Sequence, residues 1–328
     1  MQKGKELLYL CRADVERVGL TMDEIIAVLE EAFREKGHGR YEMPPKPGLH
    51  PRPDSFIHAM PCFIPGLAAA GIKWVSGFAD NQQKYGLPYI SGLFILNCPE
   101  TGLPLAVMDC VWLTAMRTGA VSGLTAKYLA RPDAAVLGVL GCGVQGRSNL
   151  AALVVACPTL RQVYCYDIKP EALQWYVAEM SQAFPQLTIT PVPSAREAVV
   201  DSDIVVTAGP ILKHPRPTIE AEWFKVGALA LPVDYDSYWQ SAALQLADRF
   251  YTDDMDQFIY HKQLGFFAGT PTVTGDLGDV VTGKVPARRD EQERLVAMNL
   301  GIGLDDVATA RILYDRALAK GIGQVLPL

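Results

Sequence analysis

"VLGVLGCGVQGRSNL", residues 136 to 150, is the stretch that decides the fold of this chain. An apolar, β-branched run ends in a turn that contains Gly141, Gly143 and Gly146, and a helix-like apolar pattern follows. This order predicts a strand, a tight turn and a helix, as in dinucleotide-binding folds. Asp167 ends the following strand-like run, "RQVYCYD", and supplies the acidic residue that such a site needs about 20 residues further on.

Each glycine has its own physical role in that turn. Gly141 permits the tight turn, Gly143 lets the backbone approach a pyrophosphate, and Gly146 lets the helix pack close to the strand. The first helical turn, with Val144 and Gln145, presents unbonded N–H groups to the phosphates. The alternative is a glycine-rich turn that binds no ligand.

The acidic residue indicates which cofactor binds. Asp167 can accept hydrogen bonds from both ribose hydroxyls, and its charge repels the additional phosphate of NADP(H). The sequence therefore predicts NAD(H), in preference to NADP(H), although the nearby Lys169 weakens that distinction. The ends of neighbouring strands complete the candidate cofactor site with Thr207, Ala208, Gly209 and Val233.

Two patterns of secondary structure divide the chain. Before residue 110, strand-like runs such as "SFIHAM", "AAGIKWVSGF", "YISGLFILN" and "PLAVMD" are joined by turns, which predicts an antiparallel or mixed sheet. From residue 134, strands and helices alternate, which predicts a doubly wound parallel sheet. We therefore expect an α/β protein: a Rossmann-type domain and a mixed α+β domain.

Several helices carry clear signals at their ends. Thr21 and Glu24 form a capping box before an amphipathic helix. A second helix covers residues 113–129, and the last one begins near residues 305 and 306. Three acids, Asp253, Asp254 and Asp256, cluster in a way that predicts a solvated acidic loop.

Composition excludes several classes of function. The 328 residues carry a net charge of −6 with acids and bases interspersed, so the basic patch of a nucleic-acid binder is missing. We expect no signal peptide and no membrane span, since no long uncharged apolar stretch occurs. The seven scattered cysteines predict reduced thiols in a cytoplasmic protein, and the dispersed histidines predict no metal site.

Two cations stand in apolar surroundings. Lys73 lies within "AAGIKWVSGF", where alternation places it and Val75 on one face of a strand. Arg117 lies on the helical stripe of Leu113, Ala120 and neighbouring apolar residues. A buried guanidinium is suited to bind a carboxylate bidentately. A snorkelling lysine and an interface salt bridge are the alternatives.

Two further residues are candidates for polar chemistry. Asp234 follows the apolar run "GALALPV" and so lies at the carboxyl end of a strand, the edge where doubly wound sheets bind ligands. Its alternative role is to cap a helix that starts near Ser237. His58, in "SFIHAMP", is either a core histidine or a hydrogen-bond donor in a pocket.

The same residues carry a resemblance. "LPLAVMDCVWLTAMRTGAVSGLTAKYLA" followed by "LGVLGCGVQGRSNL" resembles the ornithine cyclodeaminase/mu-crystallin family, in which a strand ending in "MD", a "TAxRTxAxSxxAxKxLA" helix and "GxGxQ" recur in that order. "LDDVATARILYDRA" is similar to the family's last helix. The resemblance implies a substrate-binding and dimerisation domain, residues 1–125 with 305–328, and an NAD-binding Rossmann domain, residues 126–304.

The resemblance also implies roles for individual residues. Lys73 matches the family's substrate-binding lysine, Arg117 its carboxylate-binding arginine, and Thr118 falls beside the cofactor. Asp234 matches the aspartate that cyclodeaminases place near the distal amine of the substrate. Lys46 stands where many members have arginine, and His58 where the cyclodeaminases have glutamate, so ornithine specificity is in question.

Together these observations predict an NAD-dependent oxidoreductase. Arg117, helped by Lys46, would hold the α-carboxylate of a small amino or imino acid, Lys73 would bind the carboxylate or the atom gaining charge, and Asp234 would move protons or hold an amine. This favours an amino acid dehydrogenase or a ketimine reductase.

Two other functions stay open. The first is ornithine cyclodeamination, which gives L-proline and ammonia. The second is a non-catalytic, NAD(P)H-dependent binding protein of the mu-crystallin type. The open, apolar sheet expected from residues 56 to 109 also predicts a homodimer.

Overall fold

The computed structural model describes residues 2, 4–212 and 214–328, and its chain divides into two compact units. Unit 1 comprises Met1–Arg117 with Gly301–Leu328, and unit 2 comprises Thr118–Leu300. The predicted boundary between residues 304 and 305 would cut the helix α11 (Gly303–Lys320), and the division in the structure precedes that helix instead. The other division falls inside the helix α4 (Val111–Leu129), eight residues before the predicted one at 125.

Unit 1 is built on a seven-stranded mixed sheet in the order β15-β1-β6-β5-β4-β3-β2. β1 pairs parallel with β6, and the other neighbours pair antiparallel, which confirms the mixed sheet. The strands are β1 Glu6–Leu10, β2 Gly48–Leu49, β3 Ser55–Ile64, β4 Ala69–Phe78, β5 Ile90–Asn97, β6 Pro104–Asp109 and β15 Gln324–Pro327. The further helices of this unit are α1 Arg12–Val18, α2 Met22–Gly37, α3 Asn81–Tyr85 and the 3-10 turn Pro65–Leu67.

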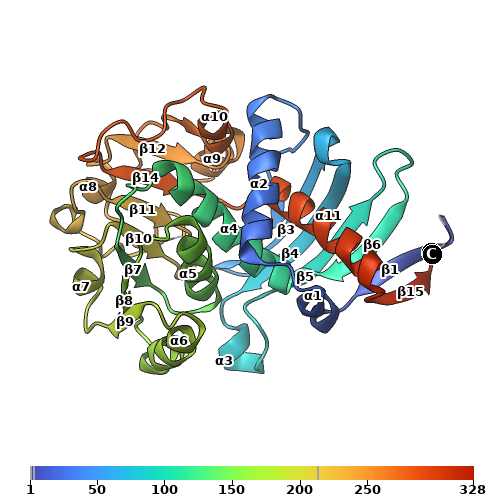
Figure 1. Ribbon diagram of the computed structural model, residues 1–328, viewed down its shortest axis with the longest axis horizontal. Helices are drawn as coiled ribbons and strands as arrows, with labels where there is room; N and C mark the ends of the chain where they lie inside the picture. Colours follow the sequence, from blue (N-terminus) through green and yellow to red (C-terminus); the bar gives the residue numbers. More distant parts are fainter. Residues whose placement is uncertain (1, 3, 213) are drawn as a thin grey trace. The chain divides into compact units, whose positions relative to one another are not determined.

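Helix α11 covers one face of this sheet. It packs across β3 and β4 on one side and against α2 on the other (Figure 1). The capping box at the start of α2 is confirmed, since Thr21 N donates to a carboxylate oxygen of Glu24 at 2.9 Å. The alternation predicted for β4 is confirmed as well: Lys73 and Val75 are buried, whereas Trp74 is 46% exposed.

Unit 2 is built on an eight-stranded parallel sheet in the order β13-β12-β14-β11-β10-β7-β8-β9, which confirms the doubly wound fold (Figure 1). The strands are β7 Val136–Leu140, β8 Gln162–Tyr166, β9 Thr188–Pro191, β10 Ile204–Thr207, β11 Leu229–Pro232, β12 Arg249–Thr252, β13 Gly275–Asp276 and β14 Leu295–Met298. The helices that alternate with them are α5 Val144–Ala156, α6 Pro170–Ala183, α7 Ala195–Val199, α8 Ser241–Leu244, α9 Met255–Gln263, α10 Leu277–Val281 and the 3-10 turn Ala221–Trp223.

The prediction of a solvated acidic loop is wrong for two of its three acids. Asp253 and Asp254 are buried, and only Asp256 of the three is exposed. Asp254 caps α9, because its Oδ1 accepts a hydrogen bond from Gln257 N at 2.7 Å. The acids therefore begin a helix that the sequence interpretation did not include. Among the described residues, no helix is both long and apolar enough to span a bilayer.

Candidate functional site

The turn after β7 combines two tightly packed glycines with one open glycine. Gly141 adopts φ +98°, and a Cβ atom there would lie 2.6 Å from Ala208 O. A Cβ atom on Gly146 would collide with the carbonyl oxygen of Gly141, whereas one on Gly143 would meet nothing within 4 Å. Close packing thus fixes the two ends of the turn, and the exposed backbone of Gly143 is left accessible to a ligand.

A carboxylate is fixed beside this turn. Asp167 follows β8, the sheet neighbour of β7, and its Oδ2 accepts a hydrogen bond from Cys142 N at 2.7 Å. Its Oδ1 accepts from Lys169 N at 2.8 Å. The N-terminus of the 13-residue helix α5 begins directly after Gly143 and carries no acid in its first turn. Exposed backbone, a helix N-terminus and a half-buried carboxylate together fit the diphosphate and ribose of a dinucleotide.

The other predicted cofactor residues lie along the same edge of the sheet. Thr207 is the last residue of β10, and Val233 directly follows β11, the next strand of the sheet. Val233 N donates a hydrogen bond to Thr207 O at 2.9 Å. Ala208 N donates to Leu140 O at 2.8 Å, at the end of β7. The structure therefore brings together the glycine turn and the carboxyl ends of three adjacent strands.

Thr118, the first residue of unit 2, lies half-buried in α4. A Cβ atom on the next residue, Gly119, would collide with Ser148 O in α5. This part of α4 therefore packs directly onto α5, the helix that follows the glycine turn.

Asp234 lies on the same carboxyl edge and is 1% exposed. Its Oδ1 accepts a hydrogen bond from Thr207 Oγ1 at 2.7 Å, and its Oδ2 accepts from Gly209 N at 2.8 Å. Burial raises the pKa of Asp234 to about 7, and the two hydrogen bonds oppose that rise. No helix of the described chain begins at Ser237, since α8 starts at Ser241, so the alternative capping role is wrong.

The residue after Asp234 has a strained backbone. Tyr235 adopts φ +65°, which costs a non-glycine residue on the order of 1–3 kcal/mol. The surrounding packing holds it there: the Tyr235 hydroxyl lies 3.3 Å from His261 Nε2, and the ring meets those of Phe266 and Phe267 edge to face. Sequence reasoning missed this aromatic group, because Tyr235 and the rings of residues 261–267 come from two separate segments. It fixes the loop that carries Asp234.

In unit 1, two predicted substrate residues meet at one buried carboxylate. Lys73 is 0% and Arg117 6% exposed. Asp306 Oδ1 accepts a hydrogen bond from Lys73 Nζ at 2.8 Å and lies 3.0 Å from Arg117 Nε. Asp305 Oδ2 lies 3.3 Å from Arg117 Nη1. We call these four side chains the ion-pair cluster.

Lys46 joins the ion-pair cluster through the backbone. Its buried Nζ donates to Gly301 O at 3.0 Å. Gly301 adopts φ +70°, and a Cβ atom on it would lie 2.5 Å from Arg117 Nη1, so the guanidinium packs directly against this residue. Lys46, Lys73 and Arg117 thus lie in one contiguous group of residues. Three cations and two carboxylates therefore meet in one buried part of unit 1.

The groups around Lys73 act in opposite directions on the pKa of its ammonium group. Burial and the positive charge of Arg117 lower the pKa of Lys73, and the carboxylate of Asp306 opposes them. A lowered pKa makes a lysine a better participant in proton transfer than an exposed one.

His58 takes a different position. It lies on β3, opposite Gly48 of β2, and is half-buried with its ring stacked on Phe56 at a centroid distance of 4.3 Å. Ala59 N donates to Pro47 O at 3.0 Å, which ties this part of β3 to the segment that carries Lys46.

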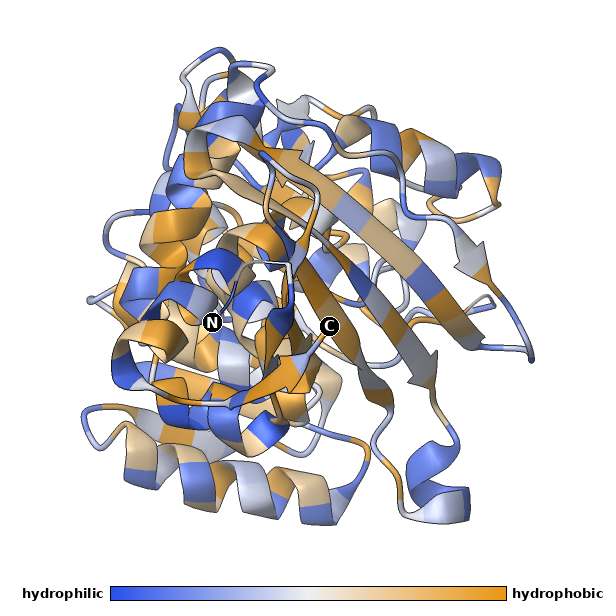
Figure 2. Cartoon of the chain, turned by 90° about the vertical axis from the view of Figure 1, so that its right-hand side faces the viewer, coloured by the Kyte–Doolittle hydropathy of each residue, from blue (hydrophilic) through white to orange (hydrophobic). Residues whose placement is uncertain are grey.

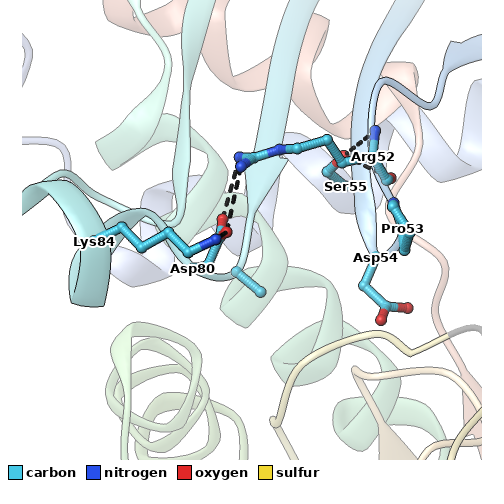
Figure 3. Close-up of a pocket in the computed structure, with 7 residues that line it drawn as sticks. Arg52, Pro53, Asp54, Ser55, Asp80 and Lys84 are labelled. Atoms are coloured by element: carbon cyan, nitrogen blue, oxygen red, sulfur yellow. Dashed lines mark hydrogen bonds and ion pairs between the residues drawn. The ribbon is translucent and has the colours of Figure 1, made fainter.

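A hollow of about 340 Å³ lies elsewhere in unit 1, at the start of β3 and the end of β4 (Figure 3). Figure 3 shows Arg52 and Lys84 directed at Asp80, whose pKa is lowered by Lys84 and Arg52. Asp54 also lines the hollow, so two acids balance the two bases. No predicted site residue lines it, and its charge balance gives it no preference for an anion.

The acids of the ion-pair cluster escaped sequence reasoning. The pair "DD" in "GIGLDDVATA" indicated only the start of a helix, although both side chains are fully buried. Two adjacent acids followed by an apolar helical pattern are a signal for buried carboxylates when a chain also carries cations in apolar strands. Their partners lie 188 and 233 residues away in sequence.

Comparisons with known proteins give the family. The model of the ornithine cyclodeaminase/mu-crystallin family matches residues 6–321. The chain is 36% identical to the nodulation efficiency protein NfeD of Rhizobium meliloti, over 97% of this chain and 98% of that protein. It is 32% identical to the alanine dehydrogenase of Archaeoglobus fulgidus, over 97% of each.

Solved structures agree with this result. The Δ1-pyrroline-2-carboxylate reductase of Thermococcus litoralis, in complex with NADH and L-proline, matches with a TM-score of 0.88 and 30% identity, covering 97% of this chain and 99% of that one. An archaeal alanine dehydrogenase dimer with bound NAD matches with a TM-score of 0.86 and 32% identity, covering 98% and 99%. This chain belongs to the ornithine cyclodeaminase/mu-crystallin family.

Proposed function

We propose that this protein is an NAD-dependent oxidoreductase that acts on the C–N bond of a small α-amino or imino acid. The observation that carries this proposal is the buried group of Lys46, Lys73 and Arg117, three cations that lie together around two buried carboxylates. The same chain carries a glycine turn that fits a dinucleotide. Relatives that interconvert amino and imino or oxo acids with NAD(H) support the assignment.

Unit 2 would hold the cofactor. The open backbone of Gly143 and the N-terminus of α5 would take the diphosphate, and Asp167 would take the ribose. The bound cofactor would supply the acceptor for the hydride of Cα, so that the substrate would become an imine and the protein would have to take up a proton from nitrogen. NAD(H) is the cofactor we assign, in preference to NADP(H).

Unit 1 would hold the substrate. Arg117 and Lys46 would bind the α-carboxylate through charge-assisted hydrogen bonds. Lys73 would bind the same carboxylate or the atom whose charge changes, and its lowered pKa allows it to take part in proton transfer. A group fixed by ion pairs before binding loses little entropy when the substrate arrives.

Asp234 would handle the proton. Its pKa of about 7 lets the carboxyl group exist in both forms near neutral pH, as a general acid and base requires. The carboxylate form can take the proton released from nitrogen in the oxidative direction. The carboxylic acid form can return it in the reductive direction.

Ornithine cyclodeamination is the second candidate, and Asp234 is the observation that favours it, since a carboxylate at this position can also hold a distal amine. His58 in place of a glutamate argues against it, because an imidazole is a poor partner for an ammonium group. The ion-paired Asp305 and Asp306 are committed to cations, so they would not bind a distal ammonium.

We also propose a homodimer formed through the uncovered face of the unit 1 sheet. Trp74 on β4 stands opposite Leu93 on β5, and both are 46% exposed. Apolar colours run along the long strands of this sheet in Figure 2. Large apolar side chains paired on an open sheet are usually covered by a second surface.

A screen with reduced and oxidised cofactor tests the function. Amino acids with NAD⁺, and imino acids or 2-oxo acid and amine mixtures with NADH, are followed by absorbance and by assay of ammonia. We expect a net change in NADH with one class of small monocarboxylic substrate. Proline and ammonia formed from ornithine without net NADH would establish the cyclodeaminase instead, and cofactor binding without turnover would indicate a binding protein.

A further inference from the structure

Two adjacent acids at the start of α11 have different partners. Asp305 Oδ2 accepts a hydrogen bond from Ile302 N at 3.1 Å, so it satisfies an N–H group at the start of its own helix. Among the described residues, the Asp306 side chain accepts no hydrogen bond from the backbone of its own helix. Its Oδ1 contacts Lys73 Nζ at 2.8 Å and Arg117 Nε at 3.0 Å, one from β4 and the other from α4.

Folding of the helix does not account for Asp306. The side chain is 0% exposed, and its Oδ2 accepts no hydrogen bond from the described residues. A buried carboxylate oxygen without a hydrogen bond costs free energy, and a buried ion pair is often no more stable than an apolar replacement. A group kept at such a cost points to a requirement for its charge and position.

We propose that Asp306 is a positioning residue for substrate binding. One oxygen holds the ammonium of Lys73 and the guanidinium of Arg117 on adjacent sides, so the two cations form a fixed pair before the substrate carboxylate arrives. This inference rests on the proposed function, in which Lys73 and Arg117 contact the amino or imino acid. Asp306 itself acts through them.

The surroundings of Lys73 determine what Asp306 contributes electrostatically. Arg117 from α4, Asp306 from α11 and Cys110, which follows β6, are the charged and titratable groups that act on its ammonium. Burial and Arg117 lower the pKa of Lys73, whereas Asp306 and Cys110 raise it. The thiol of Cys110 is neutral at ordinary pH, because burial raises its pKa to about 11. Asp306 is therefore the charged group that favours the ammonium form of Lys73.

The chain offers a matched pair of variants. Asp306→Asn and Asp305→Asn each remove one buried negative charge beside Arg117, from neighbouring positions of one helix. Of the two variants, only Asp306→Asn removes a carboxylate that contacts Lys73. Both variants should therefore unfold at lower temperature and lose activity, but they should differ in how activity depends on pH.

The decisive measurement is kcat/KM for oxidation of the amino acid as a function of pH, with kcat and KM resolved separately, because in this direction Asp234 acts as a carboxylate and limits the rate only on the acidic side. Protonated Lys73 is the binding form, so activity falls as the pH rises through its pKa. In Asp306→Asn this alkaline limb should move to lower pH by on the order of 1–3 units, with KM raised more than kcat is lowered. In Asp305→Asn the limb should stay where the wild type has it. The dissociation constant of NADH should change less than about twofold in both, because the cofactor residues belong to unit 2.

A conservative variant separates charge from position. Asp306→Glu keeps the negative charge but moves it by one methylene, so the alkaline limb should return toward that of the wild type while KM stays raised. If Asp306→Asn does not fold, the test uses Asp306→Glu. A KM of Asp306→Glu equal to that of the wild type would then overturn the positioning role.

The outcomes also separate this inference from the function on which it rests. Identical pH profiles for the two asparagine variants would overturn the role of Asp306 in an otherwise active enzyme. A wild-type protein that turns over no amino or imino acid would instead overturn the proposed function, and this inference with it.

Discussion

The ion-pair cluster of unit 1 and the carboxyl edge of unit 2 prepare for their ligands in different ways. In the cluster, buried carboxylates pair with buried cations: Asp306, for example, contacts both Lys73 and Arg117. The edge relies on backbone geometry, with Gly141 at φ +98° and Gly143 open to solvent. A substitution in the cluster therefore leaves a charge without its partner, whereas one at the edge changes shape. The two regions should fail in distinguishable ways.

The largest expected effect is on the rate of turnover. It comes from Asp234, the buried acid of the carboxyl edge that we assign to proton transfer. Asp234→Asn removes a carboxyl group whose pKa is about 7, and general acid–base catalysis is worth on the order of 10²–10⁴ in rate. The rate of amino acid oxidation in the wild type should rise through pH 7 as the carboxylate forms. In the variant the rate should be low at every pH. Initial rates from pH 5 to 9 measure both, and a rate in Asp234→Asn equal to that of the wild type would remove the residue from catalysis.

The same residue should leave a signature in stability. In the folded protein the pKa of Asp234 is about 7, above the usual 3.8, so between these values the unfolded chain has lost a proton that the folded chain keeps. The contribution of Asp234 to the free energy of unfolding therefore falls as the pH rises from about 4 to 7, by on the order of 4 kcal/mol. Urea unfolding of wild type and Asp234→Asn should be measured at pH 5 and pH 8. Relative to the variant, the free energy of unfolding of the wild type should be lower at pH 8 than at pH 5. An unchanged difference would contradict the raised pKa.

Breaking the ion-pair cluster should affect both binding and folding. Arg117→Ala should lose on the order of 2–4 kcal/mol of transition-state binding, measured as kcat/KM, because a bidentate contact with the carboxylate disappears. It should also lose on the order of 3–5 kcal/mol of stability, since Asp305 and Asp306 are left buried without their guanidinium.

The control lies in cofactor affinity, which Arg117→Ala should barely change. Fluorescence titration with NADH and thermal unfolding complete the test. Unaltered kcat/KM per folded molecule, in a protein of lower melting temperature, would reduce Arg117 to a structural ion pair.

A change of shape at the edge should affect the cofactor alone. Gly143→Ala adds a methyl group that meets no atom of the described chain within 4 Å, so the melting temperature without cofactor should stay the same. The methyl group should nevertheless obstruct the diphosphate and weaken NADH binding by about tenfold or more. Gly146→Ala is the matched comparison, since its Cβ collides with Gly141 O and should lower stability as well. Equal NADH affinity in Gly143→Ala and wild type would place the diphosphate elsewhere.

The smallest effect concerns the choice between cofactors. Asp167→Ala removes the carboxylate held by Cys142 N and Lys169 N, and with it the repulsion of a ribose phosphate. The preference for NADH over NADPH should narrow by roughly tenfold, on the order of 1.4 kcal/mol. Parallel titrations with the two cofactors measure it. Tighter NADPH than NADH binding in the wild type would contradict the assignment.

The sequence was informative where the physics is local. The glycine turn, the strand before it, the helix after it and Asp167 lie within about 30 residues, so spacing alone predicts the edge. Alternation in β4 likewise predicts that Lys73 and Val75 share one face of the strand, and the structure shows that this face is buried. The acids that meet Lys73 and Arg117 could not be found this way, because the contacts depend on where α11 packs on the sheet.

Two other features were inaccessible for related reasons. Tyr235 gives no sign in the sequence of its left-handed backbone, since the conformation is imposed by rings from distant segments. Asp253 and Asp254 looked solvated because charge clusters usually are, yet Asp254 caps a helix whose apolar pattern is short. In each case tertiary packing overrides a reasonable local expectation.

Transfer of a label from the cofactor to Cα tests the central claim most directly. The wild-type protein is incubated with an imino acid substrate and NADH that carries deuterium at C4 of the nicotinamide, on either face, and the product is analysed by mass spectrometry. Our account predicts that one of the two labelled cofactors delivers one deuterium to Cα of the amino acid, with one NADH consumed per product. Product formed without label from either cofactor, or NADH bound without product, would contradict it.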